Sequence, residues 1–211
     1  MASIFNLNVF RNETANRGIH RSNKWLALIP LPATLRANNI LSQYANQNNL
    51  NFSVVQNRIM VWCDAGPLPG VGLHSRPLMT AGYGSTEKKP THPLFEDVSL
   101  SFINDGQSAN WTFFQQWINS IVNYDSSRGT HITGDFTDPY EVNYKDDYCV
   151  DIVLQSYNEV GDNTTSILIR EAYPNFISPL NMNWGDSNIQ RITVSFTYVD
   201  WYNLGIKKNL S

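Results

Sequence analysis

Charged side chains are scarce in this chain. Asp, Glu, Lys and Arg make up 16% of its 211 residues, whereas about 25% is typical of soluble proteins. The net charge is −3, and the basic residues are scattered, with short pairs only at Lys88-Lys89 and Lys207-Lys208. Proteins that hold DNA need many Lys and Arg side chains to displace counterions from the phosphates. Stable nucleic-acid binding is therefore not expected.

Cysteines are few and long apolar runs are missing. Cys63 and Cys149 are the only cysteines, and no CxxC is present, which excludes a four-cysteine zinc site. Each lies in an apolar, strand-like pattern, which favours free buried thiols over a disulfide. The N-terminus lacks the pattern of a signal peptide, and no window approaches eighteen apolar residues. We therefore expect a protein made in the cytosol that does not contact membranes.

Motifs for phosphate binding or catalysis are also missing. The stretch 66–72 lacks the GK[ST] ending of a phosphate-binding loop, and no GxSxG is present. Glu96 and Asp97 are neighbours on a predicted strand and so point to opposite faces; Asp146 and Asp147 fit a solvated junction. The four histidines are dispersed in predicted loops: His20, His74, His92 and His131. The sequence therefore predicts no enzyme, no metal site and no cofactor.

Aromatic residues, by contrast, are plentiful. The chain has six Trp, ten Tyr and ten Phe. Many aromatics combined with few charges are typical of surfaces that meet other proteins. A β-rich fold with an Asn- and Ser-rich surface would give the same composition, so composition alone leaves both interpretations open.

Alternation of apolar and polar residues predicts β-strands along most of the chain. The clearest strands are 95–103 and 189–199. On one face they carry Val98, Leu100, Phe102, Ile192, Val194, Phe196 and Tyr198. Further strands are predicted at 24–29, 52–63, 148–155 and 164–170, the last two as a hairpin closed by a turn at 161–163. The fold class is therefore mainly β, a sandwich or barrel of about seven strands with one helix packed on it.

That helix is predicted at 111–124, with Asn110 as a candidate N-cap. Apolar residues at i, i+4 and i+8 form a stripe that should cover a face of the sheet. The core residues expected on the helix are Phe113, Phe114, Trp117, Ile118 and Ile121. The opposite face carries Gln115, Gln116, Asn119, Ser120 and Asn123. Shorter helical turns are expected within 33–44.

The stretch 64–94 is rich in Gly and Pro and is expected to be a long loop. Loops of this length are usually functional or disordered, and a disordered linker would be more polar than this one. We therefore expect it to dock on its own subunit or on a neighbour. Candidate docking residues are Leu68, Val71, Leu73, Arg76, Leu78 and Tyr83. Two more loops are expected, a polar one at 125–147 and a proline-punctuated one at 173–184.

Four segments stand in a characteristic order: 61–70, 95–105, the helix from Phe114 to Trp117, and 173–202. Together they resemble the tail tube proteins of contractile-tailed bacteriophages. The resemblance implies a single domain over 23–202, between an N-terminal arm (1–22) and a C-terminal tail (203–211). Relative to shorter members of that family, 33–50 looks like an insertion, and 1–22 has no clear counterpart.

The resemblance also implies a non-enzymatic structural protein of the virion, assembled in the host cytoplasm. In that family six copies form a ring whose strands join into one β-barrel around a channel. The rings stack into the inner tail tube, through which DNA is ejected. The implied partners are other copies, the tail sheath protein, the tape measure protein, the baseplate tube initiator and the tail terminator. DNA would be present only in transit.

Each surface has a candidate role in such a tube. The strands 95–103 and 189–199 are candidates for the channel wall, because Ser and Thr occupy one of their faces. The loop 64–94 is the candidate for ring-to-ring contacts. A baseplate tube initiator or the inner tube of a secretion or injection machine remains an alternative. From a different class, a carbohydrate-binding β-sandwich would also be aromatic-rich and acidic.

Overall fold

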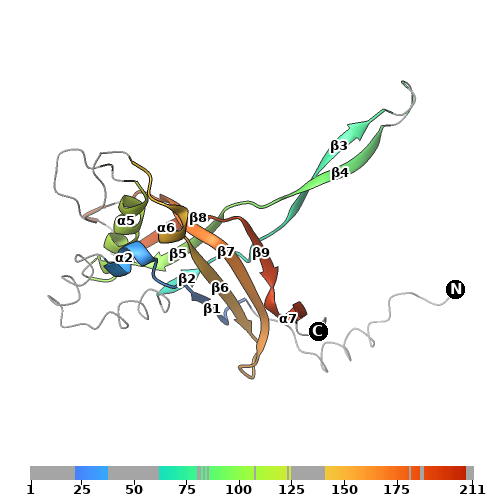
Figure 1. The fold of residues 1–211 in the computed structure, drawn as a ribbon. Helices are drawn as coiled ribbons and strands as arrows, with labels where there is room; N and C mark the ends of the chain where they lie inside the picture. Colours follow the sequence, from blue (N-terminus) through green and yellow to red (C-terminus); the bar gives the residue numbers. More distant parts are fainter. Residues whose placement is uncertain are drawn as a thin grey trace.

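The computed structural model confirms a mainly β protein, built on one nearly closed sheet (Figure 1). It describes residues 22–37, 62–79, 82, 84, 86–106, 108–122, 124, 141–180, 182–185 and 188–207. The expected strand residues 52–61, helical residues 38–44 and most of the 125–147 loop therefore lie outside the described residues.

Seven of the described strands form the main sheet, and all of their pairings are antiparallel. They are β1 (Trp25–Leu28), β2 (Cys63–Ala65), β5 (Val98–Ile103), β6 (Val150–Tyr157), β7 (Asn163–Ile177), β8 (Arg191–Thr197) and β9 (Asp200–Asn203). The order across the sheet is β1-β6-β7-β8-β5-β2, and β9 also pairs with β7. The other two described strands, β3 (Gly72–Leu78) and β4 (Glu87–Leu94), form a separate pair.

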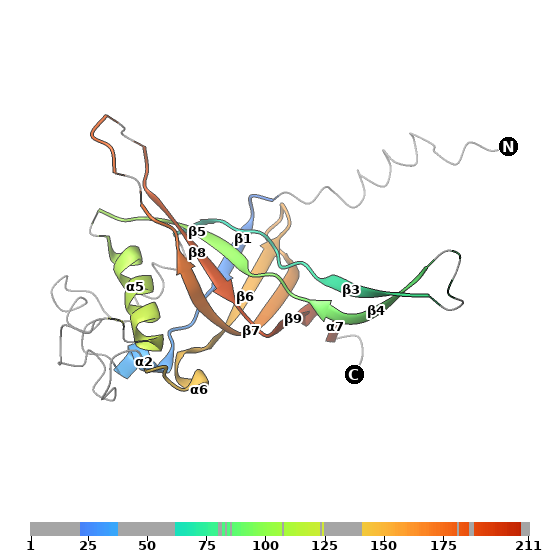
Figure 2. The same cartoon turned by 90° about the horizontal axis from the view of Figure 1, so that it is seen from above.

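The described helices are α5 (Ala109–Ile121) and three short ones: α2 (Ala33–Ala37), α6 (Lys145–Tyr148) and α7 (Leu204–Lys207). Helices α2, α5 and α6 gather at one end of the sheet, whereas β3 and β4 project beyond the opposite end (Figures 1 and 2). The two ends of the molecule are therefore different surfaces.

Strand β7 is longer than expected because it continues through the predicted proline-punctuated loop. Its first part pairs with β6 and β9, and residues 173–177 pair with β8. Pro174 lies at a register shift between Pro174 and Phe176, a place where the missing N–H of proline is tolerated. The expectation of a loop from residue 173 was therefore wrong; the described chain leaves the strand after Ile177.

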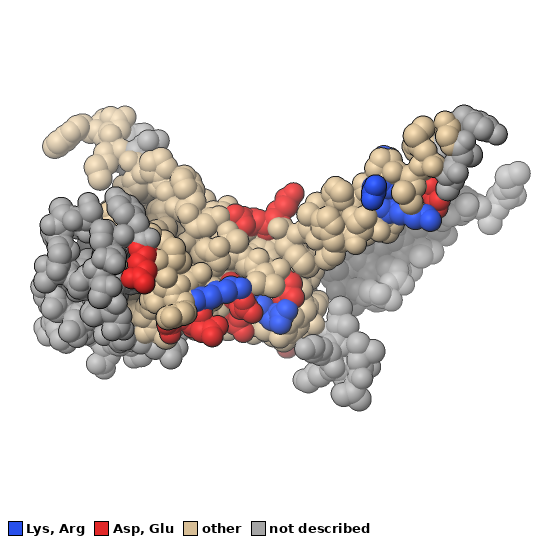
Figure 3. All heavy atoms as spheres, turned by 45° about the horizontal axis from the view of Figure 1, so that its top comes forward, with Lys and Arg blue, Asp and Glu red and all other residues tan. Residues whose placement is uncertain are grey.

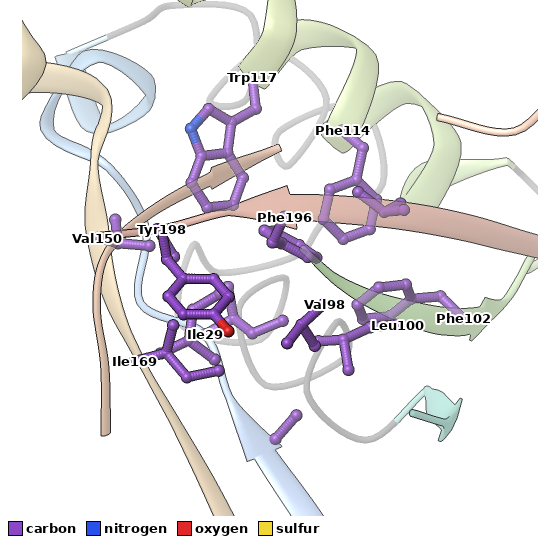
Figure 4. Packing of buried hydrophobic residues seen from close by; sticks show 14 of the residues in the cluster. Ile29, Val98, Leu100, Phe102, Phe114, Trp117, Val150, Ile169, Phe196 and Tyr198 are labelled. Carbon is purple, nitrogen blue, oxygen red and sulfur yellow. The ribbon is translucent and has the colours of Figure 1, made fainter. Parts of the chain in front are cut away.

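The core follows the alternation of the strands. Val98, Leu100 and Phe102 of β5 are buried, as are the inward residues of β6, β7 and β8. From α5, Phe114 and Trp117 pack onto the sheet, with ring centroids 4.7 Å apart for Phe102 and Phe114 and 6.0 Å apart for Trp117 and Phe196 (Figure 4). Phe113 and Ile121 are buried as well, while Ile118 is only half-buried. The aromatic stripe of α5 thus closes one end of the core.

The start of α5 differs from the prediction. The helix is preceded by Ser108, in the left-handed region at φ 55° and without a side-chain cap. Asn110 lies inside the helix, buried, and its Nδ2 donates to the Ile103 carbonyl at 2.6 Å. Asp105 accepts from the backbone N–H of Ala109 at 2.6 Å, so it satisfies one of the helix's free donors. The interpretation of Asn110 as N-cap was wrong. Asn110 lies inside the helix, and its side-chain amide donates to a carbonyl at the end of β5 instead of capping the helix.

The polar face of α5 is not wholly exposed either. Asn119 and Ser120 are buried. Ser120 donates to the Trp117 carbonyl at 2.7 Å and accepts from the Thr34 hydroxyl at 3.3 Å. The short helix α2 therefore covers part of this polar face, and Ser120 can be buried there because its hydrogen bonds are met.

We predict that Trp117→Ala lowers the free energy of unfolding by about 3–5 kcal/mol. Trp117 is fully buried and its Nε1 donates to the Tyr148 carbonyl at 2.9 Å, so the change leaves a cavity and an unpaired acceptor. The matched control is Trp111→Ala on the same helix, where the ring is 37% exposed and a loss of roughly 0.5–1 kcal/mol is expected. Urea unfolding measures both; equal losses would contradict the packing described above.

Candidate assembly interface

The stretch predicted as a loop without regular structure contains a β-hairpin, which we call the arm (β3 and β4). Its register pairs His74 with His92 and Arg76 with Lys89. Three prolines, Pro77, Pro90 and Pro93, lie in its strands. Both strands of a two-stranded ribbon are edge strands, and there a proline need not break a ladder of hydrogen bonds. This is why a proline-rich sequence can still form a hairpin.

Most of the candidate docking residues are exposed on the arm or at its root, by which we mean the connections to the main sheet at residues 66–71 and 95–97. The exposed fractions are 54% for Leu68, 56% for Val71 and 68% for Leu73. Arg76 is also exposed, Leu78 is half-buried, and Tyr83 lies outside the described residues. Met79, another apolar residue of this stretch, is 66% exposed, and Leu94, which the sequence pattern did not single out, is 45% exposed. An isolated two-stranded hairpin is marginally stable in water, so these apolar side chains favour a further contact.

The root of the arm is held to the main sheet at two points. Trp201 of β9 donates from Nε1 to the Gly70 carbonyl at 3.0 Å. At Gly66, a Cβ atom would lie 2.4 Å from Leu100 Cδ2 and 3.3 Å from the Trp25 ring, so only glycine fits without a shift in the core. Beside Gly66 lies a cleft of about 380 Å³ between β1 and the arm root, lined mainly by Trp25, Pro67, Leu68 and Leu154.

Strand β9, which carries Trp201, is joined to β7 by the ion pair of Arg170 and Asp200, which we call the clasp. Arg170 donates to both carboxylate oxygens of Asp200, a fork geometry that favours the charged forms. The hydrogen bond from Arg170 lowers the pKa of Asp200 below its ordinary value of 3.8. The same pairing raises the pKa of Arg170. The clasp therefore joins β7 to β9, and Trp201 of β9 in turn contacts the root of the arm.

The arm also brings together two histidines that the sequence placed in separate loops. The rings of His74 and His92 stack with centroids 4.9 Å apart, and Thr91 lies within hydrogen-bond distance of both. Arg76, Lys88 and Lys89 also lie in the strands of the arm, and Figure 3 shows basic side chains both on the arm and on the main body. In the part of the chain that the structure describes, no three His, Cys, Asp or Glu side chains are grouped as metal ligands.

A second projecting surface lies in the connection between β7 and β8 (residues 178–190), which extends away from the sheet in Figure 2. Met182, Trp184 and Ile189 are 87%, 107% and 61% exposed. In the sequence, Trp184 stood inside the segment 173–202 but was not selected as a contact residue. The sequence shows only an aromatic residue inside a polar loop. The alternation that identifies buried strand residues does not identify an exposed side chain in a loop.

Neither cysteine is arranged for catalysis. Cys63 and Cys149 are free and half-buried. Burial raises the pKa of the Cys63 thiol to about 12 and that of the Cys149 thiol to about 11. At neutral pH both are thus held as thiols, which are poor nucleophiles. No described helix is long and apolar enough to cross a bilayer.

The described residues therefore offer several exposed apolar surfaces. A comparison with protein families gives a match to the one described as "Phage tail tube protein", over residues 21–204. The chain belongs to the phage tail tube protein family. Membership gives it a structural role in the tail tube and a place in the virion. The comparison with curated proteins gives no match.

Solved structures share the fold at low sequence identity. The cap that terminates the tube of the anti-feeding prophage has a TM-score of 0.54 at 11% identity, covering 88% of this chain and 90% of that one. A chain of the sheath–tube complex of an extracellular contractile injection system, in the extended state, has a TM-score of 0.51 at 10% identity, covering 91% and 95%. A chain of the anti-feeding prophage baseplate has a TM-score of 0.50 at 13% identity, covering 69% and 82%.

We predict that the Arg170–Asp200 clasp makes stability depend on pH. Because the pKa of Asp200 is lower in the folded state, its contribution is complete above the ordinary value of 3.8 and is lost as the pH falls below that value. Asp200→Asn should therefore be less stable than the wild type at neutral pH, with a difference that shrinks below about pH 4. Urea midpoints across that range measure it.

The control for this prediction is Glu141→Gln, which removes an exposed carboxylate distant in sequence from the clasp. It should lower the midpoint little at any pH. A constant difference between the wild type and Asp200→Asn down to acid pH would show that the carboxylate is not the titrating group.

Proposed function

We propose that this protein forms the inner tail tube by self-assembly. Copies join into hexameric rings, the rings stack through the arm, and the resulting channel carries DNA during ejection into the host cell. The observation that carries the proposal is the arm itself: a hairpin that projects beyond the sheet with Leu73 68% exposed. Such a ribbon has both of its edges and both of its faces available to a neighbour.

The end strands of the main sheet support the joining of neighbouring copies within one ring. In the described sheet, β1 and β2 are the end strands. Exposed strand edges invite pairing with other chains, and pairing between copies would remove that hazard. Members of a head-to-tail assembly also need two different surfaces, one for each neighbour. The arm at one end and the helices at the other meet that condition (Figure 1).

The other proposed partners are the proteins that surround, start, end and measure such a tube. A sheath protein would surround it, an initiator at the baseplate would start it, a terminator would end it, and a tape measure protein would set its length. Among solved structures of the same fold are chains of a baseplate, a tube-terminating cap and a sheath–tube complex. We include these partners in the proposal, and no stable DNA binding.

A second candidate is the inner tube of a contractile injection machine, or the initiator of such a tube. The fold shared with injection-system structures supports this candidate. Both candidates predict self-assembly and differ in what surrounds and fills the tube. A carbohydrate-binding module gains no support from the family match.

We predict that Leu73→Ser weakens tube formation without unfolding the protein. Removing a Leu side chain that becomes buried in each ring contact costs about 1.5–3 kcal/mol per copy. Since about 1.4 kcal/mol corresponds to a factor of ten, the concentration needed for assembly should rise at least about tenfold. Sedimentation of assembled material across a concentration series measures it, and circular dichroism checks the fold.

The matched control is Val160→Ser, at the turn between β6 and β7, where the side chain is 85% exposed. It removes a similar apolar group from a surface that the proposal does not use, and it should assemble like the wild type. Unchanged assembly of Leu73→Ser would rule out the arm as the stacking contact, whereas loss of assembly in both variants would indicate a general effect of making the surface more polar.

A further inference from the structure

The main sheet has two outward faces of different chemistry. The first, over β1, β6, the start of β7 and β9, carries a row of large side chains in register: Leu28, Val153, Leu168 and Tyr202. All four are half-buried in the single chain. Beside the row lie the Arg170–Asp200 and Lys145–Glu171 ion pairs. Large apolar groups flanked by paired charges are typical of a protein contact.

The second outward face, over β5 and β8, carries mostly small polar side chains, with Ile103 and Arg191 paired at one end; we call the small polar part the hydroxyl face. Its members are Ser99, Ser101, Thr193, Ser195 and Thr197. They alternate with the buried residues of the two strands, so they all point away from the core. The register places Ser99 opposite Ser195 and Ser101 opposite Thr193. None of these side chains projects far beyond the backbone.

Hydrogen bonds among neighbours satisfy part of this face. The Ser99 hydroxyl donates to Ser195 at 3.5 Å, and Asn175 of β7 donates to both Thr197 and Asp97 at 2.7 Å. Groups paired with one another have less tendency to hold a passing ligand. Large side chains lie only at the margins of the face: Phe176 of β7, 57% exposed and opposite Ser195, Tyr173, half-buried and opposite Thr197, and Ile103 at the end of β5.

Positive charge on this face is neutralised. Within β2, β5, β8 and residues 173–177, the only Lys or Arg is Arg191, and its Nε donates to Asp64 at 2.7 Å. Glu96 and Asp97, exposed at the end of β5, add negative charge. Affinity for DNA comes largely from cationic side chains that replace its counterions. A face without free cations is therefore not expected to bind a polyanion.

The arm connects this face to one end of the molecule. Strands β2 and β5 run directly into β3 and β4, through residues 66–71 and 95–97. A contact made by the arm with the next ring would therefore begin at the strands that carry the hydroxyl face. That continuity would keep the wall unbroken from one ring to the next.

We propose that the hydroxyl face lines the channel of the assembled tube, where it gives the DNA of the proposed function no free cation to bind. The inference rests on the proposed function, because it needs a tube. It assigns the apolar row to contacts with protein and the hydroxyl face to the lumen.

The experiment labels single cysteines in tubes with reagents of two sizes. Ser99→Cys places a thiol on the hydroxyl face, and Ser166→Cys places a matched thiol on the other outward face, opposite Gln155. The native cysteines form a low background, because burial raises their pKa to about 12 and about 11 and thiols react slowly. The small reagent is biotin-maleimide; the bulky one is the same reagent carried on streptavidin.

In the unassembled protein, Ser99→Cys should react with both reagents. In tubes it should keep its reaction with the small reagent, which diffuses along the channel, and lose its reaction with the bulky one. For Ser166→Cys, reagent size should make no difference in tubes: both react if the site is outside, and neither if it is covered. If Ser99→Cys assembles poorly, Thr193→Cys on the neighbouring strand, or sparse mixing with wild-type subunits, gives the same readout.

Two results would overturn the assignment while leaving the tube intact. Reaction of Ser99→Cys with the bulky reagent would place the hydroxyl face outside the tube, and loss of both reactions would place it in a subunit contact. Failure of the wild-type protein to form tubes at all would instead overturn the proposed function, and this inference with it.

Discussion

One strand, β7, joins the two halves of the sheet, and the rest of the structure depends on how it bends. Its first part pairs with β6 and β9, and its last part pairs with β8. Between them Glu171 adopts a left-handed backbone at φ 52°, which is strained for a residue with a side chain. Asp151 accepts its N–H at 2.9 Å, and Lys145 pairs with its carboxylate. These contacts hold the bend that lets one sheet wrap the core.

The bend also decides which surfaces remain for other copies. Wrapping buries one face of β5, β6, β7 and β8 in the core, so the outward faces and the arm are left. Low charge suits such a molecule, since a surface that is mostly covered by neighbours gains little from solvated Lys and Glu side chains. The Arg170–Asp200 clasp fixes β9 to β7, and the Trp201–Gly70 hydrogen bond fixes the root of the arm to β9. The position of the arm therefore depends on the position of β7.

The regular parts of the fold were predictable because their signal is local. Alternation identified the buried residues of β5 and β8, and the i, i+4 stripe identified Phe114 and Trp117 as buried in the core. The arm could not be predicted in the same way, because its pattern of Gly and Pro with exposed Leu is that of a loop; its strands are fixed by pairing with each other. Asn110 misled as an N-cap because its partner, Ile103, lies in the preceding strand.

The surfaces were harder to predict than the core. The sequence selected Leu68, Val71 and Leu73, which the structure leaves exposed, but Leu94 and Trp184 were not selected as contact residues. It also could not pair His74 with His92, since that depends on the register of the arm. The Ser and Thr alternation, by contrast, was visible in the sequence, and the structure adds that the two strands lie side by side and that Arg191 is neutralised by Asp64.

The central claim is that copies of this chain build a hollow tube by themselves. Negative-stain electron microscopy of the purified protein over a concentration series tests it most directly. The account predicts stacked rings or tubes with a stain-filled channel, increasing with concentration. A uniform population of monomers at the highest concentration, even after prolonged incubation, would contradict it.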